Sequence, residues 1–252
     1  MKLSPWVYLF LLASGCEGPR EKPKPLEIKL PAASPTPAST VVLYADIFRR
    51  RLVPPGTDTN VDRVETELAK HPKDPKALKA VGLAYYAAGG YEAAIKRLTG
   101  LEDPEAQLYL GYSQMALGNH TEALAALGKL TPNTAGLTEK QLGQALLEQG
   151  NIYFQALKKD DKAEAWYRIA LRYDSSGEAT LALGLLKASQ GKTGEAQKSL
   201  VKASETLPAG KLRAAAFAAL GRLESDPAKA RAWYDKTRKD DPENPWLKKL
   251  AQ

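Results

Sequence analysis

Residues 177–210, GEATLALGLLKASQGKTGEAQKSLVKASETLPAG, contain two stretches rich in apolar residues that are separated by a short polar turn. Gly184 lies inside the first stretch and Ala196 inside the second, while Gly191 ends the first stretch and Pro208 closes the segment. Glycine inside a helix costs roughly 0.5–1 kcal/mol relative to alanine, so Gly184 indicates a place where two helices must approach closely. The segment therefore predicts a pair of packed, antiparallel helices.

The same arrangement returns along the chain. The segments KAEAWYRIALRYD, from Lys162, and KARAWYDKTRKDD, from Lys229, share Lys, Ala, Ala, Trp and Tyr in register at an offset of 67, which is close to two periods of about 34. Matching small and large residues define five copies, at 75–103, 104–132, 144–176, 177–210 and 211–243. In the last copy, Ala230, Tyr234 and Pro242 fit the pattern, and all three lie in its second half. The first helix of this copy is therefore predicted to be weak.

Residues 41–74 are a degenerate sixth copy, in which VDRVETELAKHPKDP predicts a second helix and Pro54 and Pro55 interrupt the first. The period and the Leu-Gly, Ala and Pro positions resemble the tetratricopeptide repeat. This resemblance implies an all-α fold, a right-handed superhelical solenoid of five to six helix pairs over residues 41–252. Each pair of such a solenoid buries its apolar face only against its neighbours, and the stack presents an extended binding surface.

The N-terminus has the order of a secretory signal peptide. Lys2 precedes an apolar run over 6–13, and the small residues Ala13, Ser14 and Gly15 lead into Cys16, the only cysteine of the chain. The run is shorter than the roughly 20 apolar residues of a membrane span. Its end resembles a lipobox, which predicts a signal peptide over 1–15 and a lipidated Cys16. Ordinary signal peptidase cleavage before Cys16 is the alternative, but it would leave an odd free thiol on an exported chain.

Six prolines lie within residues 16–40, at positions 19, 23, 25, 31, 35 and 37. Proline at this density prevents helix formation and favours the extended polyproline II conformation. We expect residues 16–40 to form a disordered linker that acts as a tether behind Cys16.

Composition argues against catalysis and against nucleic-acid binding. The formal charge of +7 is spread along the chain and balanced locally by acids, without the one-signed run of a nucleic-acid binder. His71 and His120 are the only histidines, and neither has a cysteine or paired carboxylates at metal-ligand spacing. The sequence contains no P-loop, G-x-S-x-G or H-E-x-x-H motif. We therefore expect no enzyme activity, no cofactor, no metal and no small-molecule substrate.

The first helices of tetratricopeptide domains line the binding groove, and this resemblance identifies candidate partner-binding residues. With the glycine of each copy as its eighth residue, the groove positions are read from the second, fifth, ninth and twelfth residues. The predicted groove consists of Lys76, Lys79, Leu83, Tyr86, Leu108, Tyr112, Met115, Leu181 and Leu185. Its middle is apolar, which favours an amphipathic or β-rich segment of a partner protein. The alternative is that some of these side chains are buried by a linker or a capping helix.

A candidate lipidated cysteine followed by five or six tetratricopeptide repeats resembles the type IV pilus pilotins, and within them the Tgl-type pilotins of gliding bacteria. The resemblance implies a palmitate-bearing lipoprotein on the periplasmic face of the outer membrane. It would bind the pilus secretin and promote secretin assembly. Secretin assembly would in turn allow pilus extension and twitching or social gliding motility. A general periplasmic scaffold for cell-envelope assembly or for cell-wall hydrolases is the alternative function.

Overall fold

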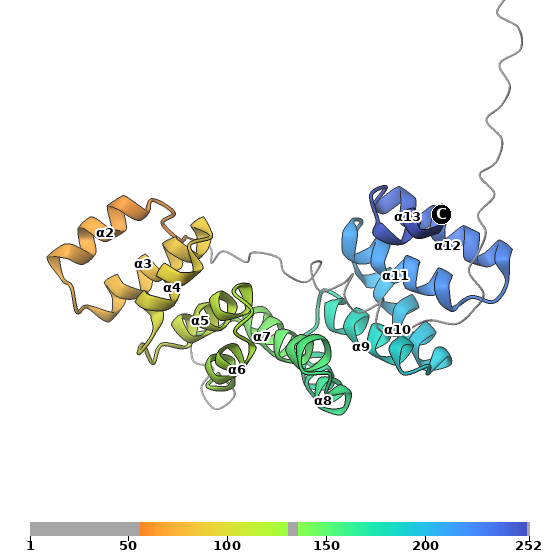
Figure 1. Cartoon of the computed structure of the whole chain (residues 1–252), viewed down its shortest axis with the longest axis horizontal. Helices are drawn as coiled ribbons and strands as arrows, with labels where there is room; N and C mark the ends of the chain where they lie inside the picture. The colour runs from red at the N-terminus through yellow and green to blue at the C-terminus, as the bar shows by residue number, and fades with distance from the viewer. Residues whose placement is uncertain (1–55, 131–135, 251–252) are drawn as a thin grey trace, which may run out of the picture.

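The computed structural model describes residues 56–130 and 136–250, with side chains as far as Leu247. Every regular element in these residues is helical (Figure 1). None of the described helices is both long and apolar enough to cross a membrane. The predicted signal peptide, Cys16, the linker and the first helix of the degenerate copy all lie outside the described residues, so these remain predictions.

Five helix pairs follow one another along a curved stack (Figure 1). They are α3 (Pro75–Ala88) with α4 (Tyr91–Leu98), α5 (Pro104–Ala116) with α6 (His120–Gly128), α7 (Glu139–Asn151) with α8 (Asp160–Ala170), α9 (Glu178–Ser189) with α10 (Thr193–Thr206), and α11 (Lys211–Leu223) with α12 (Pro227–Asp240). Helix α2 (Val61–Lys70) packs on α3, and α13 (Pro245–Leu250) follows α12. Helix α2 occupies the segment expected to be the second helix of the degenerate copy.

Local sequence sets where several helices begin. An Asp-Pro pair starts α3, α5 and α12, with the aspartate at the N-cap and the proline at the first helical position. The side chains of Asp74, Asp103 and Asp226 accept hydrogen bonds from backbone N–H groups of the first turn, which have no partner within the helix. Proline costs nothing there because it lacks the N–H that would need a partner. These signals are local and therefore readable without the fold.

A glycine in the first helix of every pair faces a large residue of the second helix. The five contacts are Gly82 with Leu98, Gly111 with Leu127, Gly150 with Tyr167, Gly184 with Leu200, and Gly221 with Tyr234. A Cβ atom at any of these glycines would lie less than 3.0 Å from the facing side chain. The recurring glycines are therefore required for close helix packing, as the sequence predicts.

The third pair contains a π-helix, η1 (Ile152–Ala156), which continues directly from α7. Gly150 precedes Tyr167 by 17 residues, whereas Gly82 precedes Leu98 by 16. A π-helix places one extra residue in a helical turn, so η1 accommodates the additional residue without moving the glycine contact. Sequence spacing alone did not reveal this element.

The last pair corrects a prediction. The first helix of the 211–243 copy was expected to be weak, but α11 is a regular helix of 13 residues. The expectation was wrong because α11 ends two residues after its glycine, whereas α3 continues for six residues after Gly82. As a result Gly221 precedes Ala230 by nine residues, whereas Gly82 precedes Ala94 by 12. The Leu220-Gly221 pair is the signal that would have identified this helix.

Candidate functional site

The face made by the first helices α3, α5, α7, α9 and α11, here called the first-helix face, carries the predicted groove residues. Six of the nine predicted side chains are buried and belong to the core, namely Leu83, Tyr86, Leu108, Tyr112, Leu181 and Leu185. Their exposed fractions are 8% or less. The expectation of an exposed apolar groove lined by these six side chains is therefore wrong. Partner binding on this face stays a prediction.

The burial follows from the way the first helices pack. Helix α3 contacts α5, and α9 contacts both α7 and α11, so large side chains at these positions fill the space between neighbouring pairs. Tyr86, Tyr109 and Tyr112 form one aromatic cluster, with ring centroids 5.0 Å apart for Tyr86 and Tyr109 and 5.7 Å apart for Tyr109 and Tyr112. Edge-on packing of this kind stabilises aromatic pairs beyond the area that they bury.

The three remaining predicted residues are accessible. Lys76 is exposed, and Lys79 and Met115 are partly exposed. The ammonium group of Lys79 lies 3.1 Å from Asp103 and 3.4 Å from Glu105. Burial alone would lower the pKa of Lys79, but the hydrogen bond to Asp103 and the two carboxylates raise it overall. Lys79 therefore joins two helix pairs and does not form a clamp for an acidic peptide.

Helix α7 supplies residues that the sequence prediction missed. Gln144, Glu148 and Asn151 lie on one side of α7, and both amides donate to the Glu148 carboxylate at 3.0 Å. The Tyr167 hydroxyl on α8 donates a hydrogen bond to the side-chain amide oxygen of Asn151 at 2.8 Å. Glu148 is only 6% exposed. The groove was read from three copies and left α7 out; counting from Gly150 as the eighth residue would have identified Gln144 and Asn151.

Tyr112 is a second buried polar residue of the first-helix face. Burial raises the pKa of Tyr112 well above its ordinary value, and the charges of Glu148 and Glu178 contribute to the same shift. Its hydroxyl is buried and has no hydrogen-bond partner among the described residues. An unsatisfied buried hydroxyl costs free energy, typically about 1–3 kcal/mol, and is uncommon in folded proteins. The polar, acidic part of the first-helix face that hydrogen bonds define is the group of Gln144, Glu148 and Asn151 on α7, named here the central cluster.

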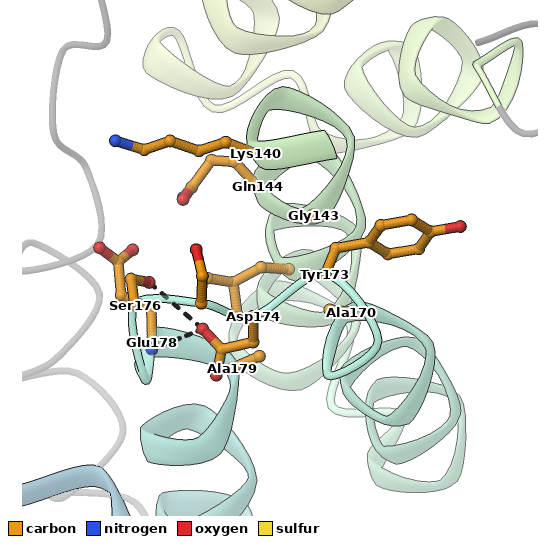
Figure 2. A pocket seen from close by; sticks show the side chains of 11 residues that line it. Lys140, Gly143, Gln144, Ala170, Tyr173, Asp174, Ser176, Glu178 and Ala179 are labelled. Atoms are coloured by element: carbon orange, nitrogen blue, oxygen red, sulfur yellow. Dashed lines mark hydrogen bonds between the residues drawn. The ribbon is translucent and has the colours of Figure 1, made fainter. Parts of the chain in front are cut away.

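A small pocket opens beside Gln144, between α7 and the start of α9 (Figure 2). Its volume is about 30 Å³, and Lys140, Gln144, Tyr173, Asp174 and Glu178 are among the residues that line it. Asp174 caps α9, because its carboxylate accepts from the backbone N–H groups of residues 177, 178 and 180. The pocket has room for water but is too small for a nucleotide or similar cofactor.

The described residues also lack a cluster with metal-binding composition. No group of three or more histidine, cysteine, aspartate or glutamate side chains within 56–130 and 136–250 could hold a metal ion. What this part of the chain offers is a surface, with Lys76, Lys79 and Met115 at one end and the central cluster in the middle.

Comparison with known proteins agrees with this architecture. Residues 82–136 match the sequence model of the tetratricopeptide repeat family. The search of curated proteins gave no significant match.

Several solved structures share the fold at low sequence identity. A structure of PilF from Pseudomonas aeruginosa is 14% identical, covers 85% of this chain and 97% of its own, and superposes with a TM-score of 0.61. The MamA protein is 23% identical, with coverage of 67% and 92% and a TM-score of 0.52. A tetratricopeptide repeat protein from Parabacteroides merdae is 17% identical, with coverage of 86% and 84% and a TM-score of 0.52. The described part of this chain is thus a tetratricopeptide-repeat solenoid, the fold of proteins that bind other proteins.

Proposed function

We propose that this protein is an outer-membrane lipoprotein, related to the Tgl-type pilotins, that binds the type IV pilus secretin subunit and promotes its assembly. The order of features along the chain carries the proposal: a signal-like segment, a single Cys16, a proline-rich stretch, and then a repeat solenoid with little else. In this arrangement acyl chains on Cys16 hold the solenoid at the membrane, and the solenoid binds the unassembled subunit. The pilus extends only when its secretin is in place.

The fold supports a binding role. A stack of helix pairs offers a long surface whose curvature suits an extended partner. PilF superposes on this chain over 97% of its own length, which is compatible with a similar number of helix pairs in the two proteins. At 14% identity, this likeness supports only the fold. Two or three acyl chains give stable anchoring, because each buried CH₂ contributes about 0.8 kcal/mol.

The proposal is tested by deleting the gene and blotting for the secretin. We expect heat-stable secretin multimers to disappear while monomers persist, and pilus-dependent motility to be lost. Normal multimers in the deletion strain would contradict the proposal. They would favour the alternative, a periplasmic scaffold for envelope assembly or cell-wall hydrolases, whose loss should instead alter cell shape or septation.

Anchoring is tested separately at Cys16. Radiolabelled palmitate should label the wild-type protein and not the Cys16→Ser variant, because serine offers no thiol for thioether formation. The Cys16→Ser protein should also move from the membrane fraction to the soluble fraction. An unlabelled wild-type protein that is found in the soluble fraction, like the Cys16→Ser variant, would contradict lipid anchoring and leave ordinary secretion as the explanation of the signal.

A further inference from the structure

We infer that a stripe of lysines on α12 binds the surface of a membrane that contains anionic phospholipid. The stripe, here called the lysine stripe, consists of Lys229, Lys236 and Lys239, which are all exposed. It lies in the α11–α12 pair, toward the C-terminal end of the stack (Figure 1). The inference rests on the proposed function, because that function brings the protein to a membrane, and it adds a second membrane contact that orients the solenoid.

The charge of α12 distinguishes it from the other second helices. The formal charges of α4, α6, α8 and α10 are +1, −1, −1 and 0, whereas α12 has five bases and two acids and a charge of +3. The residues one repeat of 34 before Lys229 and Lys239 are Glu195 and Glu205. The repeat fold accepts either charge at these positions, so packing gives no reason for the lysines of α12.

The two acids of α12 are already paired with arginines. Asp240 accepts hydrogen bonds of 2.6 and 2.9 Å from Arg213 on α11, and Asp235 lies 2.9 Å from Arg238 on its own helix. The three lysines of the stripe form no ion pair with any residue that the structure describes. Their charges therefore remain available to attract an anionic surface.

The stripe occupies one side of α12. Positions seven and ten residues after Lys229 return to the same side of an α-helix, because the helix has 3.6 residues per turn. Tyr234 faces Gly221 on α11, so the stripe lies on the side of α12 that points away from α11. Since α11 belongs to the first-helix face, a membrane bound at the stripe leaves that face open to a partner protein.

Two aromatic rings hold the middle lysine of the stripe in place. The ammonium nitrogen of Lys236 lies 4.2 Å from the ring centroid of Trp233 and 5.6 Å from that of Phe217, and the two rings stack with centroids 5.8 Å apart. A cation above an aromatic ring is attracted without losing its charge. The charge is thus ordered before binding, which lowers the entropic cost of association. Trp233 is itself partly exposed, and tryptophan is enriched at membrane–water interfaces.

The contact is strong enough to orient the protein but not to anchor it. A basic residue near an anionic surface strengthens binding about fivefold, so the three lysines and the exposed Arg231 together give a Kd of about 1 mM. Such binding does not keep the Cys16→Ser protein in the membrane fraction. Acyl chains on Cys16 make the second contact intramolecular, at an effective concentration of about millimolar, and the stripe then binds.

The test uses the full chain with Cys16→Ser, so that acyl chains do not contribute, and measures its co-sedimentation with vesicles. Vesicles of equimolar phosphatidylglycerol and phosphatidylcholine are compared with vesicles of phosphatidylcholine alone. We expect the anionic vesicles to bind the protein at least about tenfold more tightly. The difference should disappear at about 1 M salt, where the Debye length is about 3 Å.

Substitutions separate the stripe from the net charge of the chain. The combined substitutions Lys229→Gln, Lys236→Gln and Lys239→Gln should weaken binding to the anionic vesicles about 100-fold, about fivefold for each lysine. The matched control carries Lys96→Gln, Lys129→Gln and Lys202→Gln, at exposed lysines of three other helix pairs, and should weaken binding no more than about twofold. Arginine at the three stripe positions should preserve binding, since a lipid surface requires charge but no fixed geometry. Thermal unfolding by circular dichroism checks that each variant is folded.

Three results would overturn the inference. Equal losses in the two glutamine variants would show that net charge alone attracts the protein to the vesicles. Equal binding of the unsubstituted stripe to both kinds of vesicle would exclude anionic phospholipid as its partner. Binding of polyglutamate that the stripe substitutions abolish, without binding to anionic vesicles, would assign the stripe to an acidic protein segment.

The outcome is distinguishable from that of the proposed function. Secretin multimers that disappear in the deletion strain, together with vesicle binding that the stripe substitutions do not change, would leave the proposed function standing and refute the membrane contact. Vesicle binding that depends on the stripe, together with normal multimers in the deletion strain, would keep the membrane contact and refute the secretin as the partner.

Discussion

The pairs α7–α8 and α11–α12 depart from the common repeat spacing in opposite directions. Glycine and the facing tyrosine are 17 residues apart in the first pair and 13 apart in the second, against 16 in the other three pairs. The π-helix η1 takes up the extra residue, and the early end of α11, two residues after Gly221, accounts for the deficit. Both pairs nevertheless keep the contact between glycine and tyrosine. The contact is therefore the element that the fold preserves, while the chain between its two members adjusts locally.

The largest expected effect comes from breaking that contact in both pairs. Gly150→Val and Gly221→Val should each lower the free energy of unfolding by about 3 kcal/mol, because the new side chain collides with the ring of Tyr167 or Tyr234. Chemical denaturation monitored by circular dichroism measures the loss. Gly128→Ala is the control: a Cβ there meets nothing within 4 Å, so stability should stay equal or rise slightly. A loss confined to one pair would contradict a shared packing role.

Tyrosine hydroxyls should distinguish the two pairs. Tyr167→Phe removes a buried hydrogen bond of 2.8 Å and leaves the Asn151 carbonyl without this donor, so unfolding free energy should fall by about 1.5 kcal/mol. Tyr234→Phe should change it by no more than a few tenths of a kcal/mol, since the described residues provide no hydrogen bond to that hydroxyl. Equal losses in urea denaturation would contradict the hydrogen bond to Asn151 as the cause of the difference.

The α11–α12 pair should show an acid-sensitive contribution. Arg213 holds Asp240 through hydrogen bonds of 2.6 and 2.9 Å, and this lowers the pKa of Asp240 below 3.8. A lowered pKa means that the unfolded chain takes up the proton first as pH falls. The stabilisation is therefore complete above the ordinary aspartate pKa and is lost as pH falls below it.

Asp240→Asn tests this contribution. It should cost about 1 kcal/mol at pH 7. The difference from wild type should shrink as the pH is lowered through 4 toward 2. Denaturation at a series of pH values measures the difference, and a difference independent of pH would contradict the ion pair as its cause.

The smallest effect is expected from removing the extra residue of the α7–α8 pair. Deletion of Gln155, a partly exposed residue of η1, should convert the π-helix to a regular turn and change unfolding free energy by less than about 0.5 kcal/mol. Deletion of Ala182 from the regular helix α9 is the control and should be strongly destabilising, since it rotates buried residues out of register. Similar losses in thermal unfolding for both deletions would show that η1 is not a local adjustment.

Much of the fold could be predicted because its signals are local and recur. Gly184 and the glycines at the same position of two other copies, Gly82 and Gly111, identified close contacts, and the Asp-Pro pairs mark helix starts by backbone hydrogen bonding alone. Copies with altered spacing were harder to recognise in the sequence. The irregular distance to Ala230 obscured α11, and one additional residue after Gly150 gave no sign that a π-helix would form.

The candidate site was less predictable, since accessibility depends on neighbours. Leu108 and Leu181 occupy groove positions by their spacing, yet each is fully buried by the packing of adjacent pairs. Glu148 lies outside those positions, and only the structure shows that it is buried and accepts hydrogen bonds from Gln144 and Asn151. A periodic pattern indicates which side of a helix a residue occupies, but not how closely the next helix covers it.

By itself, the sequence determined the repeat, the small residues at helix contacts and the order of the helix pairs, because each depends on spacing within about 34 residues. It also supports the predictions for Cys16 and the N-terminal segment, which lie outside the described residues. Only the tertiary structure decided that the apolar groove residues are core and that an acidic cluster occupies the middle of the first-helix face. The reason is that burial and electrostatic fields arise between pairs that are distant in sequence, where no local pattern records them.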